Sequence, residues 1–262
     1  MPSHSTLSKP MPLSLVFLHG FMGSANDWDD ITKLLENEIF CLAIDLPGHG
    51  RHLRAPAKRY SLEGAAEWLL DLLAQKGIHS FLPVGYSMGG RLAFHLLINF
   101  PHRISGAIVI SASPGLLTPE QQAQRRKWDQ NMSQKLLHQP FERFLSEWYK
   151  QPLFGTLEMD VSDSFWEKRR KNDPKELAKV MRGMGTGQQN SFWTALENIE
   201  KPVLYLAGAN DTKYCSIAYQ LYEYKSITVK IIPDCGHSVH IQKPQRVTEN
   251  IKSFLHTIGG LD

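Results

Sequence analysis

The sequence predicts an α/β protein with a mostly parallel central sheet, helices on both faces and a helical lid insertion. Two observations predict this fold class. Short apolar runs, typical of buried strands, alternate with amphipathic segments along most of the 262 residues. A charged stretch from 116 to 190 interrupts that alternation. Strands that alternate with helices are typically parallel and joined by crossover helices.

Six apolar runs are the expected strands, and helices are expected between them. The runs are 13–18, 40–46, 80–84, 107–111, 203–207 and 228–232. The first two are predicted to be buried on both faces, because they carry almost no polar residue. Apolar residues recur at helical spacing over 60–75, 88–99 and 244–256, which predicts helices there.

The stretch from 116 to 190 contains no good strand run and is rich in Trp, Gln and Arg. Its helical pattern predicts a lid inserted between two strands. We therefore expect the core fold in 1–115 and 191–262, with the lid in 116–190.

The charge of the chain is concentrated in this expected lid. The whole sequence has 29 Lys and Arg against 26 Asp and Glu, a net charge of +3. Residues 116–190 hold 13 Lys and Arg and 10 Asp and Glu, so the rest of the chain has no net charge. This surplus is too small to predict a nucleic-acid partner. It fits a cover that closes over an anionic small molecule.

Targeting signals are not apparent. The polar stretch Met1–Pro12 lacks the apolar core of a signal peptide, and no run approaches the ~18 apolar residues of a membrane span. The cysteines Cys41, Cys215 and Cys235 are odd in number and form no CxxC pattern. We expect reduced thiols in a cytoplasmic protein without a membrane partner.

A G-x-S-x-G pattern provides the first candidate for chemistry. Residues 85–89 (GYSMG) follow an expected strand and open an expected helix. Small residues on both sides allow a sharp turn that exposes the hydroxyl of Ser87 at the edge of the sheet. This context predicts that Ser87 is the catalytic nucleophile or base.

A serine hydroxyl needs a partner base to react at neutral pH. In this architecture an acid follows a late strand and a histidine comes last. Asp211 follows the run 203–207, and His237 follows the run 228–232. His240 starts the next helix, and Asp234 lies too near His237 on one loop to orient its ring. The predicted catalytic triad is therefore Ser87, Asp211 and His237.

Two backbone N–H groups should face an oxyanion. The expected donors are Met88, directly after the serine, and Phe21, in the loop that ends the first strand. His19 in that loop is expected to shape it. The turn 45–50 (DLPGHG) is interpreted as architecture, although it could also line the mouth of the site.

These motifs together resemble the α/β-hydrolase superfamily over nearly the whole chain. The resemblance is carried by LHGF, DLPGHG, GYSMGG, a GxxD turn and CGHSVH. The finer patterns SMGGR and WYKQPLF resemble the 2-succinyl-6-hydroxy-2,4-cyclohexadiene-1-carboxylate synthases of menaquinone and phylloquinone biosynthesis. That resemblance implies a lyase that eliminates pyruvate from 2-succinyl-5-enolpyruvyl-6-hydroxy-3-cyclohexene-1-carboxylate. It further implies that the serine, driven by its histidine, acts as a base on a carbon acid.

The resemblance also implies the residues that bind this polycarboxylate. They are Tyr86, Arg91, Arg125, Trp148 and Arg169. Arginine suits the task because its fork pairs bidentately with a carboxylate and keeps its charge when desolvated. Three alternatives stay open: Arg126 could replace Arg125, the run 168–171 could be a solvated face, and Trp148 could be a core residue of the lid.

Two other functions remain possible from the residues alone. The same triad could serve a carboxylesterase or a C–C bond hydrolase, and the fold could serve a binding protein. No metal-binding spacing, phosphate loop or dinucleotide fingerprint is apparent, so no metal and no cofactor are expected. The sequence predicts neither the oligomeric state nor which quinone is made.

Overall fold

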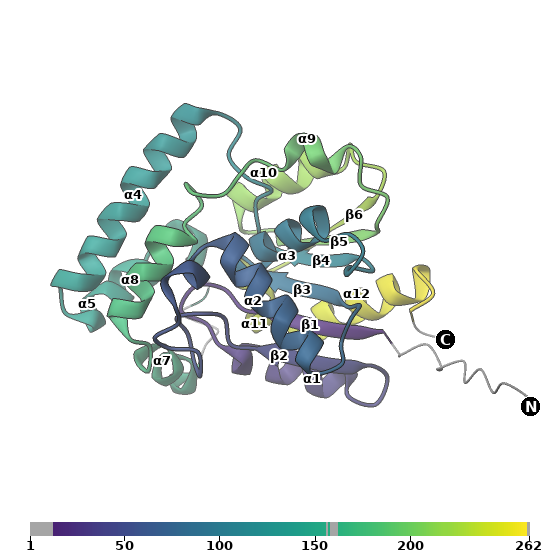
Figure 1. The fold of residues 1–262 in the computed structure, drawn as a ribbon, viewed down its shortest axis with the longest axis horizontal. Coiled ribbons are helices and arrows are strands. Elements are labelled where there is room, and N and C mark those ends of the chain that lie inside the picture. The colour runs from purple at the N-terminus through teal and green to yellow at the C-terminus, as the bar shows by residue number, and fades with distance from the viewer. Residues whose placement is uncertain (1–12, 156, 158–161, 261–262) are drawn as a thin grey trace, which may run out of the picture.

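A parallel sheet of six strands forms the centre of the computed structural model, which describes residues 13–155, 157 and 162–260. Its strands lie in the order β2-β1-β3-β4-β5-β6, and every neighbouring pair is parallel (Figure 1). They are β1 (Ser14–Leu18), β2 (Phe40–Ile44), β3 (Leu82–Tyr86), β4 (Ala107–Ile110), β5 (Val203–Gly208) and β6 (Ile227–Ile232). The predicted fold class is confirmed.

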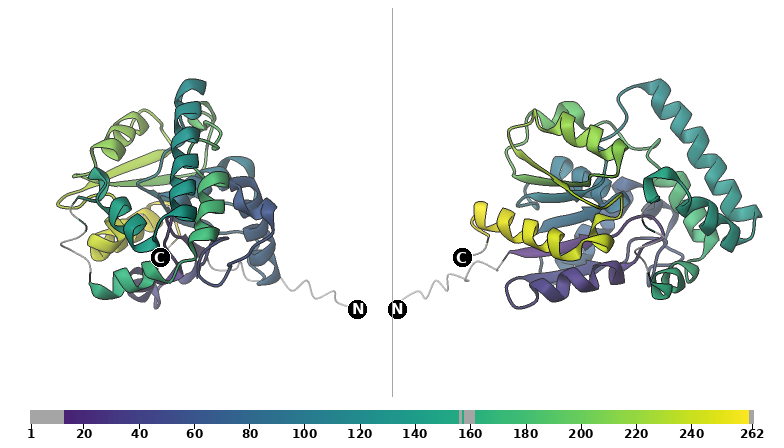
Figure 2. Two further views of the ribbon diagram at one scale, coloured as in Figure 1. Left: turned by 90° about the vertical axis from the view of Figure 1, so that its left-hand side faces the viewer. Right: turned by 180° about the vertical axis from the view of Figure 1, so that it is seen from behind.

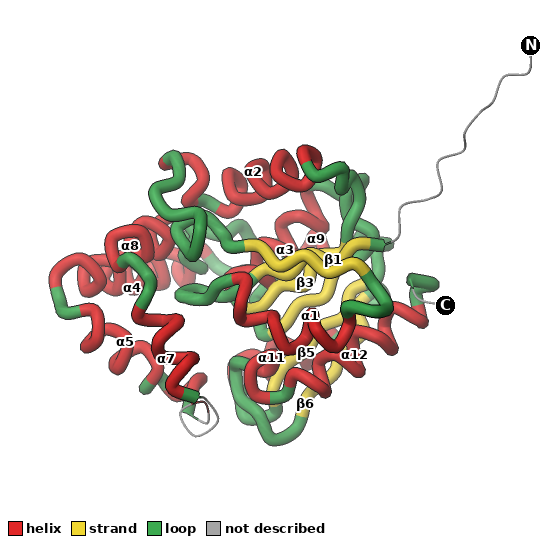
Figure 3. The backbone as a smooth tube through the Cα atoms, turned by 90° about the horizontal axis from the view of Figure 1, so that it is seen from below, coloured by secondary structure: helices red, strands yellow, loops and turns green. Residues whose placement is uncertain are grey.

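Helices cover both faces of the sheet, as Figure 3 shows from below. One face packs against α1 (Asp29–Leu35), α11 (Val239–Gln242) and α12 (Pro244–Thr257). The other packs against α2 (Leu62–Gln75), α3 (Met88–Asn99), α9 (Trp193–Leu196) and α10 (Thr212–Leu221). Short 3-10 helices lie at η1 (Ala25–Trp28) and η2 (Ala57–Tyr60). Each face thus has its own apolar core.

The edge strand β2 departs from the sequence prediction. It was expected to be buried on both faces, but Phe40 is 50% exposed and only Ile44 in the strand is buried. The strand ends at Ile44, two residues before the end of the apolar run. The reason is its place at the edge of the sheet, where strand β1 is its neighbour on one side alone. An apolar run therefore does not distinguish a central strand from an edge strand.

A group of helices between β4 and β5 stands at one end of the sheet (Figures 1 and 2). It consists of α4 (Pro119–His138), α5 (Phe141–Tyr149), η3 (Pro152–Phe154), α7 (Asp163–Arg170) and α8 (Pro174–Gly183). The described residues of this segment include no strand, as expected. They have an apolar cluster of their own, around Phe144 and Leu177, which Met22 joins from the core. We propose 116–190 as the lid, and 1–115 with 191–262 as the core.

The sequence analysis predicts neither a membrane span nor an export signal, and the structure bears on only the first of these. None of the described helices is long and apolar enough to cross a membrane. Residues 1–12, expected to lack an export signal, lie outside the described residues. All three cysteines are described, and each is a free thiol.

The contrast between core and edge gives a stability prediction. Phe94 of helix α3 is fully buried, so Phe94→Ala should lower the free energy of unfolding by about 3–5 kcal/mol through lost burial and a new cavity. Phe40→Ala at the exposed edge is the matched control and should cost less than about 1 kcal/mol. Urea unfolding measures both values. Equal losses would contradict the assignment of β2 as an exposed edge.

Candidate active site

The turn between β3 and α3 holds Ser87 in a strained conformation. Its φ is +50° and its ψ is −104°, a region that L residues rarely adopt. The two flanking glycines allow close packing around it. A Cβ on Gly85 would lie 2.2 Å from the carbonyl oxygen of Gly89, and a Cβ on Gly89 would lie 2.1 Å from that of Leu18. The G-x-S-x-G spacing therefore fits the turn sterically.

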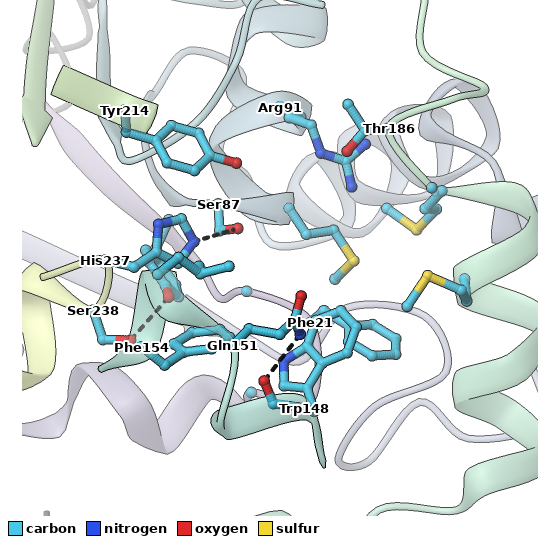
Figure 4. Close-up of a pocket in the computed structure, with 18 of the residues that line it drawn as sticks. Phe21, Ser87, Arg91, Trp148, Gln151, Phe154, Thr186, Tyr214, His237 and Ser238 are labelled. Atoms are coloured by element: carbon cyan, nitrogen blue, oxygen red, sulfur yellow. Dashed lines mark hydrogen bonds between the residues drawn. The ribbon is translucent and has the colours of Figure 1, made fainter. Parts of the chain in front are cut away.

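Ser87, His237 and Asp211 form one chain of hydrogen bonds. The Ser87 hydroxyl lies 3.1 Å from Nε2 of His237, and Nδ1 of His237 lies 2.7 Å from Oδ2 of Asp211 (Figure 4). Burial lowers the pKa of His237, while the bond to Asp211 opposes that shift. A neutral imidazole that donates from Nδ1 to the carboxylate leaves Nε2 free to accept the serine proton.

Neither rejected alternative takes part in this chain of hydrogen bonds. The ring of His240 packs between Trp28 and Tyr86, with centroid distances of 4.6 and 4.1 Å. Burial lowers the pKa of His240 to about 3. Asp211, rather than Asp234, is the carboxylate bonded to the triad histidine.

The loop after β1 is shaped by two buried histidines. His19 accepts a hydrogen bond from the N–H of Leu46 at 2.9 Å, and His49 accepts one from the N–H of Met22 at 3.1 Å. Burial lowers the pKa of both rings. His19 therefore does structural work, and the turn that carries His49 supports the same loop.

This loop and the start of α3 supply the two amides expected for an oxyanion. Met88 begins α3, and Phe21 lies in the loop after β1; both line the cavity that contains Ser87. Within the described residues, neither N–H group donates a hydrogen bond to another group. Both donors are thus free to bind a negatively charged oxygen.

A cavity of about 560 Å³ lies between the sheet and the helices inserted after β4. That volume is within the range of small-molecule sites. The core contributes Ser87 and His237 to its wall, and the inserted helices contribute Trp128, Trp148 and Met181. A ligand here would touch both parts of the fold.

Arg91 points into this cavity one turn after the serine, toward Thr186 (Figure 4). It is 7% exposed, and its Nη1 has no hydrogen-bond partner within the described residues. Burial and the nearby charge of Arg125 lower the pKa of Arg91 to about 10. Even so, it is a cation at neutral pH. A buried cation without an anionic partner is costly, and a bound carboxylate would relieve the cost.

Arg125, rather than Arg126, lies in the wall of the cavity. Its guanidinium carbon is 4.4 Å from the centre of the Trp128 ring, and its Nε donates to Asp129 at 2.7 Å. Arg126 instead donates to the carbonyl oxygen of Gly187 at 3.0 Å. The structure therefore favours Arg125 as the residue that faces a ligand.

Arg169 is buried, whereas Lys168, Arg170 and Lys171 around it are exposed. It lines the cavity and forms a two-pronged ion pair with Asp27 at 2.8 and 2.9 Å. It is also bonded to Tyr149. The run is thus a solvated face at three of its four positions. Asp27 was not predicted, because it lies 142 positions from Arg169 in the sequence, and no local pattern singles out Tyr149.

The two predicted aromatic residues also line the cavity. The hydroxyl of Tyr86 lies 2.9 Å from that of Ser238, and its ring centre lies 5.2 Å from that of His237. Trp148 is half-buried and packs on Phe21 at 5.1 Å while it contacts other rings of the inserted helices. Trp148 therefore packs among the inserted helices and also lines the cavity.

Tyr214 and Thr186 line the same cavity, and sequence analysis did not single them out. Tyr214 had one usable signal, since it lies three residues after Asp211 at the start of an expected helix. Thr186 had none beyond its place near the end of the lid.

Comparisons with known proteins agree with this geometry. The α/β hydrolase fold family matches residues 14–244. A putative 2-succinyl-6-hydroxy-2,4-cyclohexadiene-1-carboxylate synthase of Bacillus subtilis is 34% identical over 251 residues, which cover 94% of this chain and 91% of that protein. The synthase of that name from Serratia proteamaculans is 30% identical, with 92% of each chain covered.

One solved structure is similar to this chain over nearly its whole length. MenH from S. aureus superposes with a TM-score of 0.87 at 30% identity and covers 94% of both chains. A thermophilic esterase from Thermogutta terrifontis has a TM-score of 0.72 at 22% identity, a likeness in fold alone.

The ion pair between Asp27 and Arg169 gives a stability prediction. Asp27→Ala or Arg169→Met alone should cost about 3–5 kcal/mol, because each leaves an unpaired buried charge. The double variant leaves neither charge, so its loss should be smaller than the sum of the two. Urea unfolding of the four proteins forms a double-mutant cycle. Additive losses would show that the two charges do not interact.

Proposed function

This chain belongs to the α/β hydrolase fold family and, within it, to the 2-succinyl-6-hydroxy-2,4-cyclohexadiene-1-carboxylate synthases, and on that premise we propose how its site works. The protein is a lyase on a hydrolase scaffold, and it eliminates pyruvate from the enolpyruvyl cyclohexene carboxylate named above. The observation that supports this assignment best is a triad that shares one cavity with the cation of Arg91, which has no ion-pair partner within the described residues.

The triad acts as a base in this proposal. The Ser87 oxygen removes a carbon-bound proton from the substrate as its own proton passes to Nε2 of His237. Asp211 stabilises the imidazolium that forms. The electron pair of the broken C–H bond forms one ring double bond, the existing ring double bond shifts by one position, and the C–O bond to the enolpyruvyl group breaks. The departing enolate takes up the proton and becomes pyruvate. No acyl-enzyme forms and no water is consumed.

The cations and amides stabilise the charge that develops. Loss of the proton places negative charge on neighbouring carbonyl or carboxylate oxygens. We assign the amides of Met88 and Phe21 to such an oxygen, because both residues line the cavity beside Ser87 and neither N–H donates to another group within the described residues. One donor of this kind is worth about 3 kcal/mol in the transition state.

The substrate carboxylates are assigned to the arginines, with Tyr86 and Trp148 packing against the carbon skeleton. Among the described residues Arg91 has no ion-pair partner, whereas Arg125 pairs with Asp129 at 2.7 Å. Arg169 already forms an ion pair with Asp27. It can therefore bind substrate only through the N–H groups that do not donate to that carboxylate. An ester site would need no such set of cations.

We also propose that the protein works in the cytoplasm. Its three free thiols support that compartment, because oxidising compartments favour disulfides. The substrate is a small molecule.

The decisive test is release of pyruvate from the enolpyruvyl substrate, followed with lactate dehydrogenase and NADH. Ser87→Ala should abolish turnover and leave substrate affinity nearly unchanged, because the hydroxyl acts on the proton rather than in binding. The same proteins are assayed against short p-nitrophenyl esters. Ester hydrolysis that exceeds pyruvate release would refute the lyase and indicate a hydrolase.

The pKa of the triad histidine predicts the pH dependence of this reaction. Only the neutral ring accepts a proton, and burial lowers the pKa of His237 below 6.5. Activity should therefore be lost as the pH falls through a midpoint below 6.5. The pH profile of kcat/KM reports this value for the free enzyme. A midpoint above 6.5 would contradict the assignment of the base.

A further inference from the structure

Tyr214 occupies a position in the cavity that neither the triad nor the arginines account for. It is the third residue after Asp211, on the first turn of helix α10. Its backbone N–H donates to Oδ1 of Asp211 at 3.2 Å, and its ring centre lies 4.6 Å from that of His237. The backbone and the ring thus both fix this side chain against the triad.

The contacts described so far do not explain the position of the Tyr214 hydroxyl. It points into the cavity on the same side as Arg91 and Thr186 (Figure 4). Tyr214 is 9% exposed, yet no described residue makes a hydrogen bond with this hydroxyl, whereas that of Tyr86 is bonded to Ser238. A nearly buried phenol usually finds a partner. Here the space in front of it is the cavity itself.

The surroundings of this hydroxyl are cationic. Arg91 lines the same side of the cavity (Figure 4). Lys213 places its ammonium 5.2 Å from the centre of the Tyr214 ring and also lines the cavity. An O–H donor among cations is suited to an anionic oxygen, to which hydrogen bonds are strong.

We propose that Tyr214 is a substrate-binding residue, whose hydroxyl donates a hydrogen bond to the substrate carboxylate that pairs with Arg91. This inference rests on the proposed function for the identity of the substrate. Its physical basis, an unpartnered donor beside an unpartnered cation, concerns any carboxylate in the cavity.

The test removes one oxygen atom and retains the ring on His237. A hydrogen bond to a charged group is worth about 1.5–3 kcal/mol, so Tyr214→Phe should raise KM about tenfold or more and change kcat much less. Tyr214→Leu also removes the ring against His237, and should lower kcat as well. Tyr219→Phe on the same helix is the matched control, because that tyrosine is 62% exposed, and it should behave as the wild type.

A binding measurement separates this inference from the proposed function. The probe is 2-succinylbenzoate, an unreactive aromatic analogue that keeps the succinyl and ring carboxylates of the product, and calorimetry gives its Kd. Tyr214→Phe should weaken binding about tenfold even if the wild type released no pyruvate, in which case only the proposed function fails. A Kd within twofold of the wild-type value overturns the inference while pyruvate release stands. A wild-type protein that does not bind the probe overturns the inference too.

Discussion

The strained turn at Ser87 is the constraint on which the site depends. A left-handed φ at a non-glycine residue persists only where the surroundings impose it. Here they do so through the backbone of Gly89, which packs on the end of strand β1. The same contact brings the loop with Phe21 beside the start of α3. This close approach of the start of α3 to the end of β1 therefore sets the direction of the serine hydroxyl and brings Phe21 and Met88 to the same cavity.

The site also depends on the position of the helices inserted between β4 and β5 relative to this turn. Those helices have their own apolar cluster, and several contacts attach them to the core, among them Val180 and Met184, which join the core cluster. The Asp27–Arg169 pair is one of them, and it is buried at the boundary. Met22 is another, since it leaves the loop after β1 and enters the cluster of the helices. Both lie in or beside the loop that carries Phe21, so the packing of these helices and the geometry of the site are connected.

Local pattern indicates the parts of the candidate site that lie at strand ends, and the structure brings these residues together. Asp211 and His237 follow strands that are neighbours in a parallel sheet, so strand order alone brings them together. Contacts between distant segments carried no such signal: nothing in the sequence near Arg169 indicates that Asp27 is its partner. Burial on both faces was predicted correctly for β1 and wrongly for β2, because an apolar run does not specify how many neighbours a strand has. Tyr214 was not predicted because its proposed role depends on a hydroxyl without a hydrogen-bond partner among the described residues, and sequence pattern does not show hydrogen bonds.

The position of the inserted helices has a consequence for how the chain folds. They separate β4 from β5, which are adjacent in the sheet, so 92 residues must be looped out before these strands pair. Loop-closure entropy grows only with the logarithm of length, so this loop costs about 1.6 kcal/mol more than a crossover of ~15 residues. An insertion with its own apolar cluster shortens the effective loop further. This junction can therefore accept helical insertions of very different size while the sheet, and the triad at its edge, stay the same.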